Sequence, residues 1–542
     1  MAYTSAFHLD QEEDYTFMFK RKPPIRFLYV IVGLAFGASL GPSLSSCNVI
    51  GGITSYYDNE AQLAESSLSE LDRFEAVYNK YVIPGPKNDQ THRQNMDQFR
   101  DALLRVRHEY VRDVPVSELV DMAVKGMESA DPGLELGGVE PAFLIEVALD
   151  KMLTSLDPHS SYLNPLELKE MKISNRGEFG GLGITVTMEG DFVKVISPLE
   201  GTPAFRAGLK PGDLISHLDG KAIEGKSIHN AVSLMRGKPG TYIRLTINRV
   251  KMEPFDVEVR RAIIKIKSVR WHLEGDIGYV RVVSFTEKVA SGIDKAMEAI
   301  TEELGDRLAG IVLDLRSNPG GLLHQSLALS DAFLEEGIIV SVQGRRSGTQ
   351  QVFEAESGDL AGGASMVVLI DPGSASASEI VAAAMQDHHR ATIMGQRSFG
   401  KGSVQTITPL PQEGALRLTT QLYFSPAGRA IQARGIIPDI EVIPIPKEQK
   451  DESAALAVVK KSVEAAETQV ERVSAQRRRE SDLPGALSAV GEDAEHPHPT
   501  LSEAKCAPIG ERKDRTLGCA LALIQAESQA SFLASVGYSS PF

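Results

Sequence analysis

A turn of small residues joins two apolar runs of opposite character in the second half of the chain. The run Met366–Ile370 predicts a buried strand, and the alanine-rich run Ile380–Met385 predicts a helix. Between them, Asp371-Pro372-Gly373-Ser374-Ala375-Ser376-Ala377-Ser378-Glu379 places Ser376 at a strand-to-helix turn. A hydroxyl at such a turn is exposed beside free N–H groups of the helix start, which suits a developing oxyanion.

A lysine lies 25 positions after Ser376, between two glycines, in Ser398-Phe399-Gly400-Lys401-Gly402-Ser403-Val404-Gln405. Lysine acts as a base near neutral pH only if burial lowers its pKa, and flanking glycines let backbone pack closely around it. Taken singly, a serine-rich turn that caps a helix and a Gly-Lys-Gly loop are ordinary features. Together at this spacing they predict a hydrolase with a serine nucleophile and a lysine base.

These two segments resemble the carboxyl-terminal processing peptidases, also called tail-specific proteases. The resemblance implies that Ser376 is the nucleophile, that Lys401 is the general base and that Gln405 helps to orient the lysine. Asp387 falls where some members of the family have an aspartate that matters for activity. The region that resembles the family runs from about Arg107 to Ile443.

A second turn supplies the candidate oxyanion donors. The apolar run Ile311–Leu315 predicts a strand that enters Asn318-Pro319-Gly320-Gly321, and a Pro-Gly-Gly turn leaves backbone N–H groups unpaired. By itself this is an ordinary strand-ending turn. The resemblance implies an oxyanion hole built from the N–H of Gly320 or Gly321 and the N–H of Ala377, and the sequence leaves open which glycine donates.

The region Gly177–Arg261 resembles a PDZ domain. Phe179-Gly180-Gly181-Leu182-Gly183-Ile184 matches the carboxylate-binding loop, and Ser197–Ile215 matches the small-residue helix followed by Gly-Leu-Lys-Pro-Gly-Asp. The resemblance implies that a peptide tail adds as a strand while successive N–H groups capture its terminal carboxylate. The residues assigned to this capture are Gly181, Leu182, Gly183 and Ile184.

A helix predicted at Ser227–Met235 lines the peptide groove of that PDZ domain. Leu234 and Met235 are candidates for the apolar wall of the groove, and packing in the core explains both residues equally well. The turn Leu156–Leu163 resembles a family landmark just before the PDZ domain, and we interpret its His159 as structural.

The N-terminus predicts export. The basic stretch Lys20–Arg26 precedes the apolar run Phe27–Leu40, whose 14 residues are too short to span a membrane and fit a signal peptide. Leu44-Ser45-Ser46-Cys47 resembles a bacterial lipobox, which implies lipidation of Cys47 and a membrane-anchored lipoprotein of the periplasm. The long leader before the apolar run leaves an uncleaved anchor as the alternative. Cys506 and Cys519 then form an even pair, compatible with a disulfide.

These features predict a multidomain α/β protein. Alternating apolar strands and helical stretches indicate an α/β catalytic core, and the resemblance implies that this core is crotonase-like or ClpP-like. Residues 447–499 predict a helix followed by a flexible linker. The expected parts are a signal peptide with lipobox at 1–47, a helical N-terminal region at 59–172, a PDZ domain at 177–261, a serine protease core at 263–445 and a C-terminal extension at 446–542.

Charge and composition limit the partners. The 542 residues include 57 Lys+Arg and 72 Asp+Glu, a net charge of −15, so no basic surface favours nucleic acid. The sequence shows no metal-ligand cluster and no P-loop, so we expect no cofactor and no metal. We expect a serine endopeptidase that recognises accessible protein C-terminal tails through its PDZ domain, held at a membrane by a lipid or signal anchor. The sequence is also compatible with an adaptor or an oligomer.

Two alternative functions can be compared with the same residues. A non-catalytic PDZ-based binding or chaperone-like protein would keep the groove without turnover, and an intact Ser376, Lys401 and Gln405 favour an enzyme instead. An esterase is disfavoured because no Gly-x-Ser-x-Gly elbow surrounds Ser376. His388 and His389 follow the serine at what we interpret as a polar helix end, so we leave them outside the site.

Overall fold

The computed structural model describes eleven stretches of the chain. They belong to the compact unit Leu63–Phe542. The predicted signal peptide, with Cys47, and most of the helix and linker predicted at 447–499 lie outside them. No helix in these stretches has the length and apolar character needed to cross a membrane. The stretches are residues 68–82, 90–129, 140–199, 201–224, 228–250, 252–265, 267–346, 348–445, 479–491, 498–511 and 513–538.

The N-terminal region is helical, as the sequence predicts. In α2 the side chains of Phe99, Leu103 and Val106 are buried at the three- and four-residue spacing of one helix face. Leu104, in the same helix, is 37% exposed. The helices are residues 68–81, α2 (Gln90–Glu109), α3 (Val116–Ser129), α4 (Pro141–Thr154) and α5 (Pro165–Asn175).

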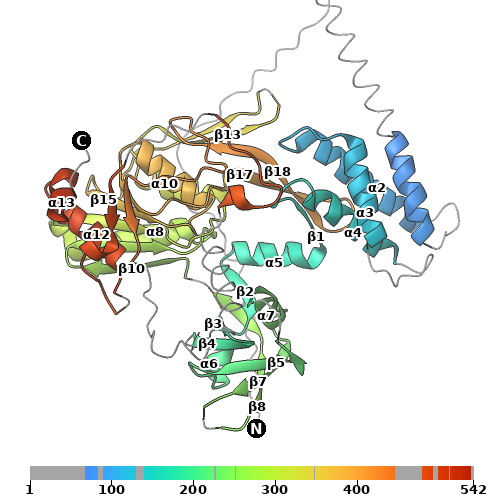
Figure 1. Ribbon diagram of the computed structural model, residues 1–542, viewed down its shortest axis with the longest axis horizontal. Coiled ribbons are helices and arrows are strands. Elements are labelled where there is room, and N and C mark those ends of the chain that lie inside the picture. The colour runs from blue at the N-terminus through green and yellow to red at the C-terminus, as the bar shows by residue number, and fades with distance from the viewer. Residues whose placement is uncertain are drawn as a thin grey trace, which may run out of the picture. The chain divides into compact units, whose positions relative to one another are not determined.

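The PDZ region forms a six-stranded antiparallel sheet with two helices, and a separate strand pair, β2 with β9, lies at its two chain ends. These elements are drawn in green in Figure 1. Their bounds are β2 (Glu178–Gly181), β3 (Ile184–Glu189), β4 (Phe192–Pro198), α6 (Pro203–Arg206), β5 (Leu214–Leu218), β6 (Lys221–Ala222), α7 (Ile228–Met235), β7 (Tyr242–Asn248), β8 (Phe255–Arg260) and β9 (Ala262–Lys265).

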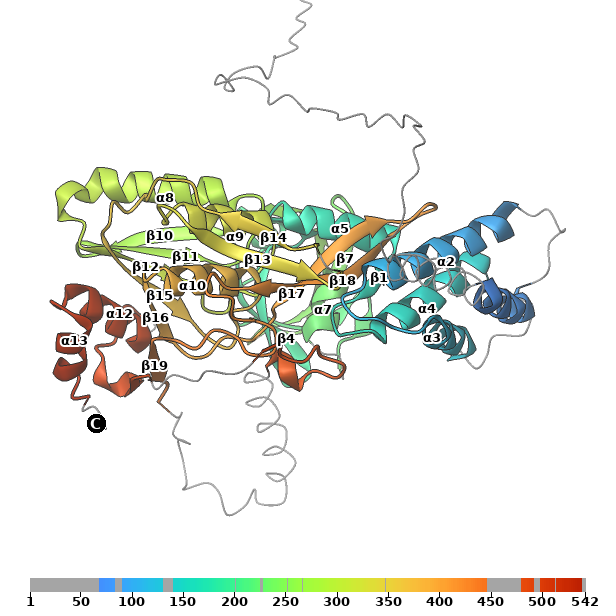
Figure 2. The same cartoon turned by 90° about the horizontal axis from the view of Figure 1, so that it is seen from above.

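The protease core is built on a seven-stranded sheet of order β10-β11-β12-β15-β16-β19-β20, parallel except for the β10–β11 pair. Helices cover both faces of the sheet (Figure 2), so its central strands, β12 and β15, are nearly continuous apolar runs. The strands are β10 (Val269–Glu274), β11 (Ile277–Val282), β12 (Gly310–Asp314), β15 (Ser365–Ile370), β16 (Thr392–Gly395), β19 (Ile440–Ile443) and β20 (Thr500–Ser502).

Successive side chains of β15 show how the two faces are filled. Met366, Val368 and Ile370 pack in the cluster formed with helices α8 (Val289–Leu304), α9 (Leu323–Asp331) and α10 (Ala377–Asp387). Val367 and Leu369 pack on the other face with α12 (Arg515–Gln525) and α13 (Gln529–Ser535). The C-terminal extension therefore forms one layer of the core, and β20 adds a strand to its sheet. The expected core, 263–445, did not include these elements.

A second sheet of five strands ties the N-terminal helices to the core. Four of its strands have the order β1-β18-β13-β14, and the fifth strand, β17, also pairs with β18. Leu410, Leu416 and Leu418 of the β17–β18 hairpin pack in the same cluster as the helical core residues of the N-terminal region. The strands are β1 (Ser161–Leu163), β13 (Ile338–Gly344), β14 (Gln351–Glu354), β17 (Ser403–Pro409) and β18 (Ala415–Phe424).

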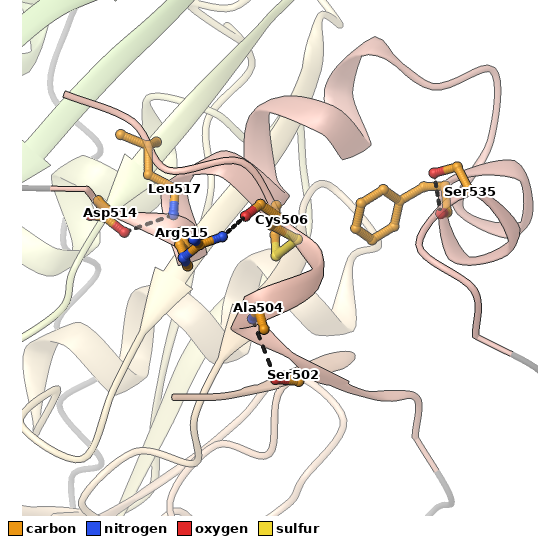
Figure 3. The surroundings of a disulfide bond; sticks show 9 residues. Ser502, Ala504, Cys506, Asp514, Arg515, Leu517 and Ser535 are labelled. Carbon is orange, nitrogen blue, oxygen red and sulfur yellow. Dashed lines mark hydrogen bonds between the residues drawn. A yellow bond between two sulfur atoms is a disulfide. The ribbon is translucent and has the colours of Figure 1, made fainter. Parts of the chain in front are cut away.

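Cys506 and Cys519 form a disulfide, with 5.1 Å between their Cα atoms (Figure 3). The bond joins the segment after β20 to α12. Beside it, Arg515 Nη1 donates to the Cys506 carbonyl at 2.7 Å, and Asp514 caps α12 by accepting the Leu517 N–H at 2.9 Å. The even pair of cysteines predicted from the sequence is thus paired in the fold.

Candidate active site

The two turns predicted to hold the nucleophile and an oxyanion donor meet at one edge of the sheet. They follow β12 and β15, which are parallel neighbours, so both strands end on the same side. The Ser317 N–H donates to Asp371 Oδ1 at 2.7 Å. The carbonyl of Asn318 accepts from the Ala375 N–H at 3.0 Å and from Ser378 Oγ at 2.9 Å. These bonds join the two turns into one unit.

Ser376 lies at the N-cap of α10 in a strained backbone conformation, with φ 56° and ψ −114°. Positive φ is uncommon for a residue with a side chain, and such strain persists only where neighbouring structure enforces it. The residue is buried, with 8% of its surface exposed. Its hydroxyl interacts with the hydroxyl of Tyr423, whose pKa burial raises to about 12 although the interaction with Ser376 acts in the opposite direction.

Backbone N–H groups beside Ser376 differ in their availability. The N–H of Gly320 donates to Asn318 Oδ1 at 3.0 Å, whereas the N–H groups of Gly321 and Ala377 have no acceptor among the described residues. A Cβ atom at Gly320 would lie 2.8 Å from the Ser376 Cβ and 3.0 Å from the Ala377 nitrogen. Gly320 therefore serves close packing against the serine, and Gly321 is the better candidate donor.

A buried glutamate links the serine turn to the lysine loop. Glu379 Oε2 accepts the N–H of Ser376 at 2.7 Å and the N–H of Lys401 at 2.9 Å, and Oε1 accepts from the Gly400 N–H and from Ser398 Oγ. Burial raises the Glu379 pKa to about 7 against these four hydrogen bonds. Our sequence analysis missed this residue, although the Ser376-x-x-Glu379 spacing is that of a capping box.

Lys401 follows β16 and leads into β17. Burial lowers the pKa of its amine, as a lysine base requires, and Arg417 acts in the same direction, whereas Glu480, Asp157 and Glu379 raise it. Its half-buried side chain makes no hydrogen bond or ion pair with any residue of the described stretches. The structure thus places the lysine and serine segments in one cluster without a direct bond between the two side chains.

The other two residues predicted for the site contact different groups. Gln405 Nε2 donates to Ser403 Oγ at 3.0 Å and to Thr419 Oγ1 at 3.3 Å, and neither bond reaches Lys401. Asp387 ends α10, at the opposite end from Ser376, and pairs with Arg429. The structure therefore does not bring Asp387 together with the serine. His388, which we left outside the site, bonds to the Ile338 carbonyl at 2.7 Å.

The PDZ loop presents free N–H groups, as its predicted role requires. Leu182 buries its side chain in the PDZ core, and the N–H groups of Leu182 and Gly183 have no acceptor in the described part of the chain. Gly183 has φ 76°, and a Cβ atom there would lie 2.3 Å from the Thr202 side chain. On the helix predicted to line the groove, Met235 packs in the core and Leu234 is 50% exposed.

Comparison with known proteins gives two family matches. Residues 180–260 match the PDZ domain family, and residues 276–442 match the family described as peptidase family S41. The chain is 54% identical over 310 residues to the carboxy-terminal-processing protease of Bartonella bacilliformis, covering 57% of this chain and 71% of that protein. It is 30% identical over 361 residues to the carboxy-terminal processing protease CtpA of Bacillus subtilis, covering 66% of this chain and 71% of that protein.

A solved structure titled photosystem II D1 C-terminal processing protease is also similar. It aligns with a TM-score of 0.43 and 27% sequence identity, over 64% of this chain and 92% of that chain.

Proposed function

Because this chain belongs to peptidase family S41, as a carboxy-terminal-processing serine protease with a PDZ domain, we propose that Ser376 is its nucleophile and Lys401 its general base. One observation carries the assignment: a single buried carboxylate, Glu379, accepts the backbone N–H groups of both residues. The lowered pKa of Lys401 supports its role, since a neutral amine is needed to accept a proton.

In the proposed reaction, Ser376 Oγ attacks the carbonyl carbon of the scissile bond while its proton passes to Lys401 Nζ. The carbonyl oxygen becomes negatively charged and is met by the N–H groups of Ala377 and Gly321. When the tetrahedral intermediate collapses, the C–N bond breaks, and the leaving amine takes the proton from Lys401. Water then hydrolyses the acyl-serine ester. The missing Ser376–Lys401 bond fits this scheme, because catalytic hydrogen bonds often tighten only when substrate binds.

Substrate choice is assigned to the PDZ domain. A peptide tail that added beside β3 would set its terminal carboxylate against the free N–H groups of Leu182 and Gly183. Engagement of the tail is proposed to favour the catalytic arrangement, as recognition domains commonly do. Deletion of the PDZ domain without loss of cleavage would contradict this gating.

The proposed location is the periplasm, with the protein anchored to a membrane through Cys47. The Cys506–Cys519 disulfide supports an oxidising compartment. We expect Cys47→Ala to move the protein from the membrane fraction to the soluble fraction of cells. An unchanged distribution would favour an uncleaved anchor instead of a lipid.

The decisive test is cleavage of an unfolded protein with an apolar C-terminal tail by the full-length enzyme. We expect Ser376→Ala and Lys401→Ala each to reduce cleavage by about a thousandfold or more, with tail binding retained. Ser291→Ala and Lys295→Ala, at exposed positions of α8, are the matched controls. An inactive wild type that binds tails would favour a PDZ-based binding protein.

A further inference from the structure

A segment of the C-terminal extension, residues 479–491, lies directly against the lysine loop. It contains the helical turn drawn in orange-red beside β17 in Figure 1. The Glu480 N–H donates to the Phe399 carbonyl at 3.0 Å, two residues before Lys401. Just after the lysine, the Gly402 N–H donates at 2.9 Å to Gln432 Oε1, and Gln432 Nε2 donates to the carbonyl of Leu487 at 3.3 Å. The segment is thus bonded directly to the loop before Lys401 and, through Gln432, to the residue after it.

Glu480 of this segment has a fully buried side chain. Its two carboxylate oxygens each lie 2.9 Å from His159 Nε2, and Oε1 also accepts from Gln432 Nε2 at 3.1 Å. Burying a carboxylate is costly unless it is paired, so this position is specified by its partners. His159 was interpreted from the sequence as structural, and its partner lies 321 positions further along the chain.

The same pair adjoins a second buried carboxylate. Asp157 accepts the N–H of His159 at 2.8 Å and the hydroxyl of Thr419 at 3.0 Å. Thr419 Oγ1 in turn receives the Gln405 Nε2 contact described above. A polar network therefore runs from Glu480 through the His159 turn to Gln405, the residue predicted to orient the lysine.

Charged groups act on the Lys401 amine in addition to its burial. Glu480 has the largest effect of these, and it raises the pKa of the amine. Arg417 opposes it, and Asp157 and Glu379 act with it. Since the Lys401 side chain has no hydrogen-bond partner among the described residues, its surroundings are set by burial and by these charges.

We propose that Glu480 is a positioning residue for Lys401, so that the C-terminal extension supplies part of the active site. The carboxylate, held by His159 and Gln432, attracts the ammonium form of the lysine. This inference rests on the proposed role of Lys401 as the base. It also gives His159 a defined task, which is to hold the carboxylate of a distant segment at the site.

The test is the pH dependence of kcat for the full-length enzyme with a peptide substrate. Activity rises with pH as Lys401 loses its proton, so the position of the acidic limb of the profile reports the pKa of the Lys401 amine. Removing the carboxylate in Glu480→Gln is expected to move this limb to lower pH by about one unit. Asp482→Asn, which removes an exposed carboxylate from the same helical turn, is expected to leave the limb in place, as is the charge-conserving Glu480→Asp.

A limb that stays in place in Glu480→Gln would overturn the inference, even if kcat or Tm falls, because that pattern indicates a structural role alone. If Glu480→Gln does not fold, the double variant with His159→Gln replaces the pair by two neutral amides, and the same shift is expected. Ser376→Ala and Lys401→Ala are measured alongside. If either retains wild-type cleavage, the proposed dyad fails, and that result is distinct from an unmoved limb in an enzyme that depends on both residues.

Discussion

Two regions of this protein are proposed to offer backbone N–H groups to a peptide, and they are supported in different ways: one is the pair of turns at Asn318 and Ser376, and the other is the PDZ loop. The two turns proposed to be catalytic are braced by the fully buried polar side chains of Asn318 and Glu379. The PDZ loop is placed by the buried apolar side chain of Leu182, and Gly183 packs on Thr202, whose hydroxyl donates to the Gly183 carbonyl at 3.0 Å. Donors that stabilise a transition state must be fixed in advance, whereas a loop that captures tails must stay accessible.

The bracing of the catalytic turns is tested most severely at Glu379. Its carboxylate accepts from four donors, and Glu379→Gln places an NH₂ group among them. We expect kcat to fall about a hundredfold, since displaced donors and a displaced lysine loop each cost transition-state stabilisation. Glu302→Gln, at an exposed site on α8, is the control. Full activity in Glu379→Gln would show that the bracing is not needed for catalysis.

The same residue predicts how stability depends on pH. The pKa of Glu379 is about 7 in the fold and 4.5 ordinarily, so the folded protein holds a proton that the unfolded chain has lost between these values. Stability from this group is therefore greatest below pH 4.5 and falls as pH rises to about 7, by about 3 kcal/mol at most. Chemical unfolding of wild type and Glu379→Gln checks this, because the difference in their unfolding free energies should narrow over that range. A constant difference would contradict the raised pKa.

Close packing of the two catalytic turns is tested at Gly320. In Gly320→Ala the new Cβ would lie 2.7 Å from the Ala375 carbonyl oxygen and 2.8 Å from the Ser376 Cβ. We expect cleavage to fall tenfold to a hundredfold, less than the loss of a whole oxyanion donor costs, because the donors are displaced and not removed. Gly428→Ala is the control: Gly428 has a positive φ of 78° and open space around it, so this variant measures the effect of backbone strain without a steric clash. Equal losses in the two variants would assign the effect to strain alone.

The corresponding test of the PDZ loop is Gly183→Ala. Its Cβ would overlap the Thr202 side chain at 2.3 Å, which should shift the N–H groups that face a peptide carboxylate. We expect the Kd for a C-terminal peptide to rise about tenfold, a change of about 1.4 kcal/mol, measured by fluorescence anisotropy. Gly208→Ala is the matched control, with φ 78° and no atom within 4 Å. If cleavage of a short peptide falls as much as tail binding, the PDZ loop and the proposed catalytic turns do not act separately.

The smallest effect on activity is expected at the disulfide. Cys506→Ser with Cys519→Ser removes a crosslink between residues 13 positions apart, which should lower stability by about 3 kcal/mol and leave kcat within about twofold. Thermal unfolding and cleavage assays measure the two quantities. A larger loss of activity would point to the ion pairs that Arg316, just before the oxyanion turn, makes with Asp514 and Asp314.

The residues proposed for the site could be named from the sequence because each lies in a short segment with a distinctive pattern. Ser376 and Lys401 each lie in a short glycine- or serine-rich segment, and the strand that precedes Ser376 is a plain apolar run. The resemblance then assigned roles that spacing alone could not. The PDZ loop could be recognised from the sequence in the same way, because its glycines and its free N–H groups lie within a few consecutive positions.

Residues joined across long stretches of chain were not predictable in this way. Glu379 has only the spacing of a capping glutamate in the sequence, and its contact with the lysine loop depends on how β16 lies beside β15. Glu480 lies in a charged extension with no distinguishing pattern, and its partner His159 precedes the PDZ domain. Tertiary packing brings the members of such pairs together, and the local sequence around each residue does not indicate its partner.

The sequence by itself determined the family, the strand and turn that carry Ser376, and the glycines that let backbone approach both sites. Those features depend on local conformation and on hydrophobic period, which neighbouring residues set. Only the tertiary structure decided that Gly321 rather than Gly320 keeps a free N–H, that the C-terminal extension adds β20 to the sheet, and that Glu480 is buried by the lysine loop. Each of these depends on which distant groups meet, and the cost of burying an unpaired polar group selects the arrangement in which they do.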